Sequence, residues 1–380
     1  MAKHSNLSPS SSKMWIACPP SAQLNAKIPD KGSEYAAQGT DAHALCEAKL
    51  KNALGVEAEE PQAALAYLDT EMEECSDAYV QFVMEKVAVA KNPIVMVEQH
   101  LDFSAFVPDG FGTGDCVIVS EGNLHIIDFK YGTGVAVSAG SDEEGVNPQL
   151  ACYALGALSA FDGIYDIESV SMSIFQPRRE VTETYTVTKD GLLKWAEEVL
   201  CPAAKLASEG GGEFKAGDHC RFCKAKQTCR KRAEYNLELA RYDFEKPDTL
   251  EDAEIEAILA RADEFISWAN DVKDYAFNAA VSGKEWEGWK LVEGRSNRKY
   301  ISEDAVADTV NKAGFDPYEH KVLGITAMTK LLGKTKFDEL LGSLIEKPAG
   351  KPTLVPMSDR RPALKNSAQY DFSKEEKDYD

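Results

Sequence analysis

The sequence lacks any long hydrophobic run. No stretch approaches the roughly 18 uninterrupted apolar residues that a membrane-spanning helix needs, and the N-terminal segment MAKHSNLSPSSSKMW has no apolar secretory core. Internal repeats at solenoid periods are also missing. We therefore expect a cytoplasmic globular protein without a membrane partner. A chain of 380 residues that is 44% hydrophobic and 28% charged predicts two or three domains.

Positive charge is scarce. Lys and Arg number 42 against 63 Asp and Glu, which gives a net charge of −21. Such an excess of acid argues against a polyanion partner over most of the surface, because binding nucleic acid requires neutralised phosphates. The exception is residues 215–232, which hold seven Lys or Arg and one Asp. This segment indicates a local anion site.

Hydrophobic periodicity predicts helices first, then three strands, a helix and two more strands. The expected helices cover 34–54, 63–91, 148–161 and 189–207, and the expected strands cover 94–103, 114–120, 124–129, 170–176 and 182–187. This order predicts an α/β core with a mixed central sheet flanked by helices. We expect one domain over 1–246, a mainly helical accessory module over 247–346 and a disordered tail over 347–380, where no periodicity is visible.

Two segments bring together groups suited to phosphodiester hydrolysis. In IIDFKYG, Asp128 and Lys130 alternate along a strand and share a face. A carboxylate can hold a divalent cation while the ammonium orients water. Asp115 precedes the strand that a hairpin turn at 121–123 places alongside, and hard oxygen ligands favour Mg²⁺ or Mn²⁺. The alternative is that Asp115 caps the hairpin and Asp128 is a charge at its rim.

Cysteine spacing points to a metal or redox site, because disulfides are not expected in a reducing compartment. Cys220, Cys223 and Cys229 form a C-x2-C-x5-C pattern in the basic segment. Single cysteines in helical or strand-like runs are interpreted as small hydrophobic residues, and these are Cys46, Cys75, Cys116, Cys152 and Cys201.

Four short motifs occur in one order: Gly39 to His43 as G-x-x-x-H, Gly114-Asp115, Asp128 to Lys130 as (D/E)-x-K, and Gln149 to Tyr153 as Q-x-x-x-Y. The set resembles the RecB-like nucleases of the PD-(D/E)XK superfamily, over residues 7–242. The resemblance implies a restriction-endonuclease-like core. It implies metal ligation by His43, Asp115, Asp128 and the Phe129 carbonyl, water positioning by Lys130, and contact of Gln149 and Tyr153 with the DNA backbone. Glu98 on the preceding strand would add a second-shell carboxylate.

The cysteines give a second resemblance. Cys18-Pro19 followed by C-x2-C-x5-C is similar to the split pattern of the iron-sulfur nucleases, which include AddB and the CRISPR-associated RecB-like exonucleases. That resemblance implies a 4Fe-4S cluster held by Cys18, Cys220, Cys223 and Cys229, joining the two ends of the domain as a staple. Zinc at the same four sulfurs is the alternative.

The resemblance implies a metal-dependent DNA exonuclease that serves phage or prophage recombination or replication. Its partners would be DNA and a phage single-strand annealing or recombinase protein. A non-cleaving DNA-end-binding or scaffold protein with the same fold is the alternative, and an electron-transfer protein fits less well because no second cofactor motif is present. The C-terminal part resembles a phage and prophage family known only as a domain of unknown function. Its Lys290, Arg295, Arg298 and Lys299 predict either a DNA contact or a solvated charged strand.

Overall fold

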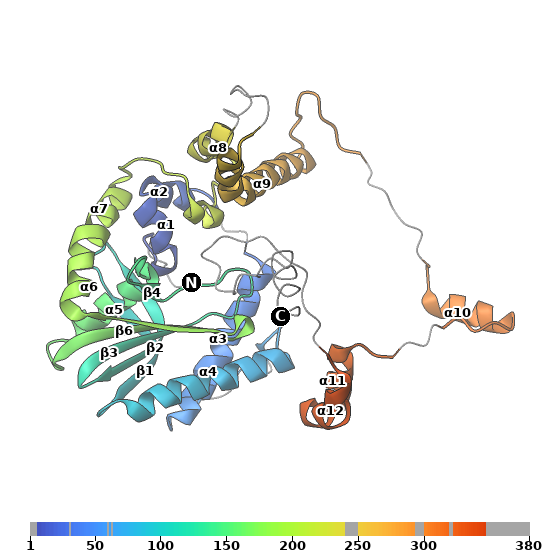
Figure 1. Cartoon of the computed structure of the whole chain (residues 1–380), viewed down its shortest axis with the longest axis horizontal. Coiled ribbons are helices and arrows are strands. Elements are labelled where there is room, and N and C mark those ends of the chain that lie inside the picture. Colours follow the sequence, from blue (N-terminus) through green and yellow to red (C-terminus); the bar gives the residue numbers. More distant parts are fainter. Residues whose placement is uncertain are drawn as a thin grey trace, which may run out of the picture. The chain divides into compact units, whose positions relative to one another are not determined.

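Five strands pair into one sheet in the computed structural model of the chain (Figure 1). In spatial order they are β1 (Ile94–Asp102), β2 (Phe111–Ser120), β3 (Gly122–Phe129), β6 (Ile167–Gln176) and β7 (Val181–Thr188). β3 and β6 run parallel, and the other neighbours are antiparallel. The predicted α/β class with a mixed central sheet is confirmed.

The structure describes residues 6–29, 32–58, 61, 64–239, 250–292, 300–318 and 322–346. The predicted tail over 347–380 lies outside them. The other elements of the first unit are η1 (Pro9–Ser11), α1 (Ser12–Ala17), α2 (Pro20–Ala26), α3 (Glu34–Ala53), α4 (Thr70–Val89), β4 (Gly140–Ser141), β5 (Gly145–Val146), α5 (Pro148–Phe161), η3 (Pro177–Arg179), α6 (Lys189–Trp195), η4 (Ala196–Leu200), α7 (Cys201–Glu209), η5 (Asp218–Phe222), α8 (Arg230–Leu237) and α9 (Asp252–Val281). None of the helices in the described ranges has the length and hydropathy of a membrane span.

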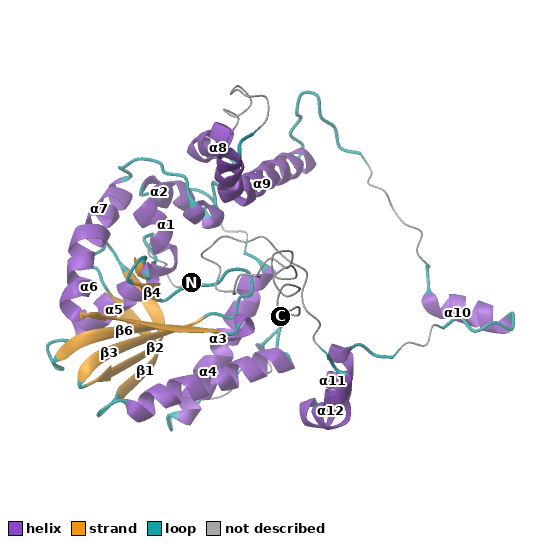
Figure 2. Ribbon diagram, in the orientation of Figure 1, coloured by secondary structure: helices purple, strands orange, loops and turns teal. Residues whose placement is uncertain are grey.

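Helices cover both faces of the sheet (Figure 2). One face packs against α3 and α4, and the other packs against α5 and α6, with α1, α2 and α7 beyond them. Alternation along β3 separates the two cores: Leu124 and Ile126 point into the α5 side, while Ile127 and Phe129 point into the α3 side. Each buried strand therefore presents apolar side chains to both layers.

Local sequence determines the β2–β3 hairpin and the start of the crossover helix α5, and these two features position the candidate site residues. In the β2–β3 turn Ser120 pairs with Asn123, and Gly122 adopts φ +76°, which a side chain would disfavour. The crossover helix α5 begins at Pro148 because Asn147 caps it, its side chain accepting hydrogen bonds from the amides of Gln149 and Leu150. This start places the first turn of α5 next to the carboxyl end of β3.

A buried histidine on β3 makes stability depend on pH. Nε2 of His125 lies 2.7 Å from Oγ of Ser173 on β6. Burial, together with the charge of Lys86, lowers the pKa of His125 to about 4, below its ordinary value of 6.5. The unfolded chain therefore takes up a proton that the folded chain resists. The stability that depends on neutral His125 is fully present above pH 6.5. It is lost as the pH falls from 6.5 towards 4.

We therefore expect His125→Gln to reduce the acid sensitivity of the fold. Between pH 7 and pH 4 the wild-type chain should lose roughly 3 kcal/mol more of its free energy of unfolding than the variant does. Urea titrations at the two pH values measure this difference. Equal losses of the free energy of unfolding in the wild type and the variant would contradict a role of His125 in acid sensitivity.

The first compact unit extends past the predicted boundary at residue 246. It spans Met1–Lys284 and so includes α9. The guanidinium of Arg232 on α8 is fully buried and contacts Glu264 and Asp271 of α9, each at 2.6 Å. A buried charge requires such partners, and these two ion pairs attach α9 to the unit that contains the sheet.

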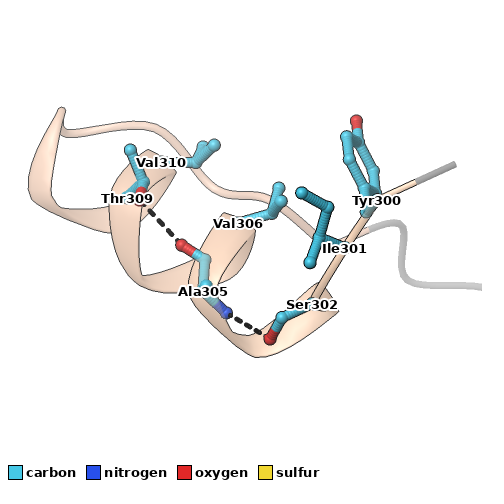
Figure 3. Close-up of a pocket in the computed structure, with 7 residues that line it drawn as sticks. All are labelled: Tyr300, Ile301, Ser302, Ala305, Val306, Thr309 and Val310. Atoms are coloured by element: carbon cyan, nitrogen blue, oxygen red, sulfur yellow. Dashed lines mark hydrogen bonds between the residues drawn. The ribbon is translucent and has the colours of Figure 1, made fainter. Parts of the chain in front are cut away.

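The second unit spans Glu285–Asp380, and its described helices are α10 (Glu303–Lys312), α11 (Ile325–Leu332) and α12 (Lys334–Leu341), followed by the short η7 (Gly342–Leu344). Figure 3 shows a hollow along α10 where Ser302 caps the helix and Thr309 bonds to the Ala305 carbonyl. The residues that line this hollow are mostly apolar and include no Asp, Glu, His, Lys or Arg. Lys290 is exposed, and Arg295, Arg298 and Lys299 lie outside the described residues.

Candidate metal centre

Three side chains from three elements meet at one edge of the α3 layer. They are His43 on α3, Glu98 on β1 and Asp115 on β2, and one ligand atom from each lies within 4.8 Å of the others. Nδ1 of His43 is 3.3 Å from Oδ1 of Asp115. The sequence resemblance implied His43 and Asp115 as ligands, and the structure brings these two together.

The ladder between β1 and β2 is interrupted at Glu98, although its register is the same on both sides. Val97 pairs with Cys116 and Gln99 pairs with Gly114, so Glu98 and Asp115 lie opposite each other without pairing. Glu98 has φ +51°, a left-handed conformation that is uncommon for a residue with a side chain. The sequence interpretation gave Glu98 a second-shell role, but the structure places its carboxylate among the possible ligands.

The charges in this group perturb one another. Although burial lowers it, the pKa of His43 is raised to about 9 because the Asp115 carboxylate is adjacent. Burial next to Asp115 raises the pKa of Glu98 to about 7. Burial also opposes ionisation of Asp115, but the positive charges of His43 and Lys130 outweigh it and keep the pKa of Asp115 below its ordinary value. Without a metal, His43 is therefore protonated and pairs with Asp115 at neutral pH, and a divalent cation held by the three side chains would take the place of that proton.

A second set of contacts adjoins the first at the end of β3. Nζ of Lys130 lies 2.8 Å from Oδ2 of Asp128, which confirms that the two share a face. The Gln149 amide joins them, since its Oε1 accepts from Lys130 and its Nε2 donates to Asp128, both at 3.1 Å. The same Nε2 lies 3.3 Å from the Tyr153 hydroxyl.

Gln149 and Tyr153 are engaged inside the protein. The resemblance implied that both contact the DNA backbone, whereas here Gln149 bridges Asp128 and Lys130, and Tyr153 is 7% exposed. The Tyr153 ring fits against Gly112, where an added Cβ would lie 2.9 Å from the ring. In this structure the motif therefore orients Asp128 and Lys130.

Asp115 links the two sets. Its Oδ2 accepts a 2.7 Å hydrogen bond from the backbone amide of Phe129, the residue between Asp128 and Lys130. Burial, with the like charge of Asp115, raises the pKa of Asp128, while Lys130 partly offsets both. The pKa of Lys130 is raised, because the nearby carboxylates outweigh its burial, so it stays charged at neutral pH.

The donor set fits a hard divalent cation. One imidazole nitrogen with carboxylate oxygens is a combination that Mn²⁺ accepts readily and Mg²⁺ accepts with added water ligands. His43, Glu98 and Asp115 form the only such group of three among the described residues. Asp128 adjoins this group but is not a member of it, so its predicted ligation requires a small movement or an intervening water.

We expect Glu98→Gln to weaken Mn²⁺ binding by at least about tenfold, because it removes one charged donor and keeps the side-chain size. Electron paramagnetic resonance of free Mn²⁺ measures this without any assay of activity. Glu47→Gln is the matched control, since Glu47 affects the pKa of Glu98 but lies outside the group. Equal losses in the two variants would show that Glu98 acts only through its charge.

The four predicted cluster cysteines lie in two segments that dock on each other. Nδ2 of Asn25 donates to Sγ of Cys223 at 3.4 Å, and Oδ1 of Asn25 accepts from the Lys224 amide. Met14 packs against Cys223, and the Cys18 side chain raises the pKa of His219 by accepting its hydrogen bond. The segment after residue 12 and the loop after residue 217 are therefore neighbours.

The structure does not gather the sulfurs of these cysteines around one point. Tetrahedral Zn–S bonds of about 2.3 Å bring sulfurs to within about 4 Å of one another. Within the described ranges no three of these sulfurs lie within 4.8 Å of one another. A four-iron cluster places each thiolate on a different iron and so holds the sulfurs further apart.

Comparison with known proteins places the chain in a family without an assigned activity. The family described as "Protein of unknown function (DUF2800)" matches residues 4–362. The chain belongs to the DUF2800 family. A solved structure titled "Crystal structure of SSO0001" is similar to this DUF2800 member at 11% identity, over 58% of this chain and 95% of that chain, with a TM-score of 0.24. That likeness is too low to support an argument about the DUF2800 fold.

Proposed function

We propose that this chain is a metal-dependent DNA nuclease of the RecB-like PD-(D/E)XK type, acting as an exonuclease in phage or prophage recombination or replication. The observation that carries the proposal is that a hydrogen bond from the Phe129 amide to Asp115 joins the possible metal ligands to the Asp128–Lys130 pair. One set offers ligands for a divalent cation, and the other presents a charged lysine beside a buried carboxylate. Phosphodiester hydrolysis requires both.

Each residue has a role that follows from its contacts. His43, Glu98 and Asp115 would hold Mg²⁺ or Mn²⁺, with Asp128 and the Phe129 carbonyl completing the site. When bound, the cation supplies Lewis-acid catalysis and lowers the pKa of a water molecule. Lys130 acts as a hydrogen-bond donor that orients the attacking water, because its raised pKa excludes a role as general base.

Gln149 keeps that lysine in place. Its amide accepts from Lys130 and donates to Asp128, so both groups are held before substrate arrives. Preorganised donors of this kind stabilise developing charge without reorganising during the reaction. The Tyr153 ring in turn supports Gln149 from one helical turn further along α5.

The cysteine loop supports a structural 4Fe-4S cluster in the same proposal. Cys18, Cys220 and Cys223 are buried, and Cys229 is partly buried. Binding of one cluster by all four thiolates requires these sulfurs to approach one another, since no three of them lie within 4.8 Å in the described ranges. The cluster would join the N-terminal segment to the loop and would not take part in hydrolysis.

The test is digestion of end-labelled DNA by the full-length protein purified without oxygen. We expect degradation with Mn²⁺ or Mg²⁺ and none in EDTA, and separate 5′ and 3′ labels report the polarity. Tight binding of DNA ends without cleavage in either metal would favour the non-cleaving scaffold. Cleavage that persists in EDTA would contradict a metal-dependent mechanism.

A further inference from the structure

The basic segment over 215–232 separates into inward and outward cations. Lys226 and Arg232 point inward, where both contact Asp271 of α9. Lys215, Arg221 and Arg230 are exposed and make no ion pair with any other residue in the described ranges. The chain as a whole has a net charge of −21, so these exposed cations form a positively charged segment in an otherwise acidic protein.

An exposed aromatic ring lies among these cations. Phe222 is 67% exposed at the end of η5, between the exposed Arg221 and the buried Cys223. Phe214 is 44% exposed and precedes Lys215. Because the flanking cysteines are buried, the turn directs the phenyl ring outward. Alternation of exposed aromatic rings with cations is the pattern of surfaces that stack unpaired bases and contact their phosphates.

A series of packed elements connects this loop to the candidate metal centre. α1 contacts η5, and it is six residues long, which corresponds to about 9 Å. The preceding turn η1 packs on α5, where Pro9 and Tyr153 both adjoin Gly112. A strand held at the loop could follow these packed elements towards Tyr153, whose hydroxyl contacts Gln149 beside Asp128.

We propose that Phe222, with Arg221 and Arg230, forms a contact site for single-stranded DNA next to the candidate metal centre. The choice of DNA as ligand rests on the proposed nuclease function. Single strands are favoured over duplex because stacking on phenyl requires an unpaired base with an open face. The exposed guanidiniums neutralise the phosphates on either side of that base.

The test is binding of a fluorescein-labelled oligothymidylate to the full-length protein in EDTA, followed by fluorescence anisotropy. Phe222→Ala should weaken binding by about tenfold, because one stacked base is lost. Phe222→Trp should retain the affinity, since the indole preserves stacking. Phe315→Ala is the matched control, because Phe315 is 71% exposed in the other unit, and it should bind like the wild-type protein.

Salt dependence tests the cations separately. Arg221→Gln should lower the slope of log affinity against log salt concentration by about 0.7, the value for one single-strand phosphate contact. Phe222→Ala should leave that slope unchanged. Melting temperatures of the variants should match the wild type, because both side chains are exposed.

Unchanged affinity of Phe222→Ala would overturn the inference, and so would an equal loss of affinity for a blunt duplex. No metal is present in this assay, so its outcome does not depend on cleavage. If the wild-type protein digests DNA and Phe222→Ala binds the oligothymidylate with full affinity, the contact site is rejected and the nuclease proposal stands. A Phe222-dependent affinity without digestion would reject the nuclease alone.

Discussion

Replacing Asp128 with asparagine should lower the rate of DNA cleavage by at least about 100-fold. The substitution removes the charge that pairs with Lys130 at 2.8 Å and that also acts on His43 and Asp115. Loss of one preorganised electrostatic group commonly has an effect of this size or larger. The single-turnover rate with saturating Mn²⁺ measures it, and binding of the labelled strand in EDTA should be retained.

The matched control is Asp162→Asn. Asp162 also pairs with a lysine, Lys189, at 3.0 Å, but it lies at the C-terminal end of α5, the opposite end from Gln149. We expect that variant to cleave like the wild-type protein. Full activity of Asp128→Asn, or equal losses in the two variants, would remove Asp128 from the mechanism.

Cys223→Ser should yield a colourless protein that melts roughly 10 °C lower than the wild type. The wild-type protein purified without oxygen should be brown and contain about four irons per chain. Cys223 is buried where the N-terminal segment docks, so loss of its bond to iron would also release Asn25 and Met14. Iron content and calorimetry measure the two effects.

Cys201→Ser is the control for that variant, because Cys201 lies on α7 outside the proposed ligand set. It should keep both the iron and the melting temperature. Retention of four irons by Cys223→Ser would show that the ligands are assigned wrongly. One zinc per chain in the wild type would replace the cluster and leave the nuclease proposal unaffected.

Residues with local signals were predictable from the sequence. Alternation along one strand was enough to place Asp128 beside Lys130, and the ion pair confirms it. The helix predicted over 148–161 is observed as α5, with Asn147 capping its start, so Gln149 lies in the first turn. The Gly122 turn likewise aligned β2 with β3. In each case the information lay within a few consecutive residues.

Other features depend on distant parts of the chain. Glu98 joins the metal group because the register of β1 against β2 places it opposite Asp115, and that register cannot be read from either strand alone. Arg232 looked like one more exposed charge in a basic segment, but its carboxylate partners lie 32 and 39 residues later. Those long-range pairs also explain why the first unit extends through α9.

The docking of Asn25 on the cysteine loop has a consequence for synthesis on the ribosome. Asn25 and its partner Lys224 are 199 residues apart. At about 5–20 residues per second, the N-terminal segment leaves the exit tunnel roughly 10–40 s before its partner is made. By the end of that interval the whole sheet, Ile94 to Thr188, has been translated. The proposed cluster on Cys18, Cys220, Cys223 and Cys229 would therefore be completed only after the last strand of the sheet has been made.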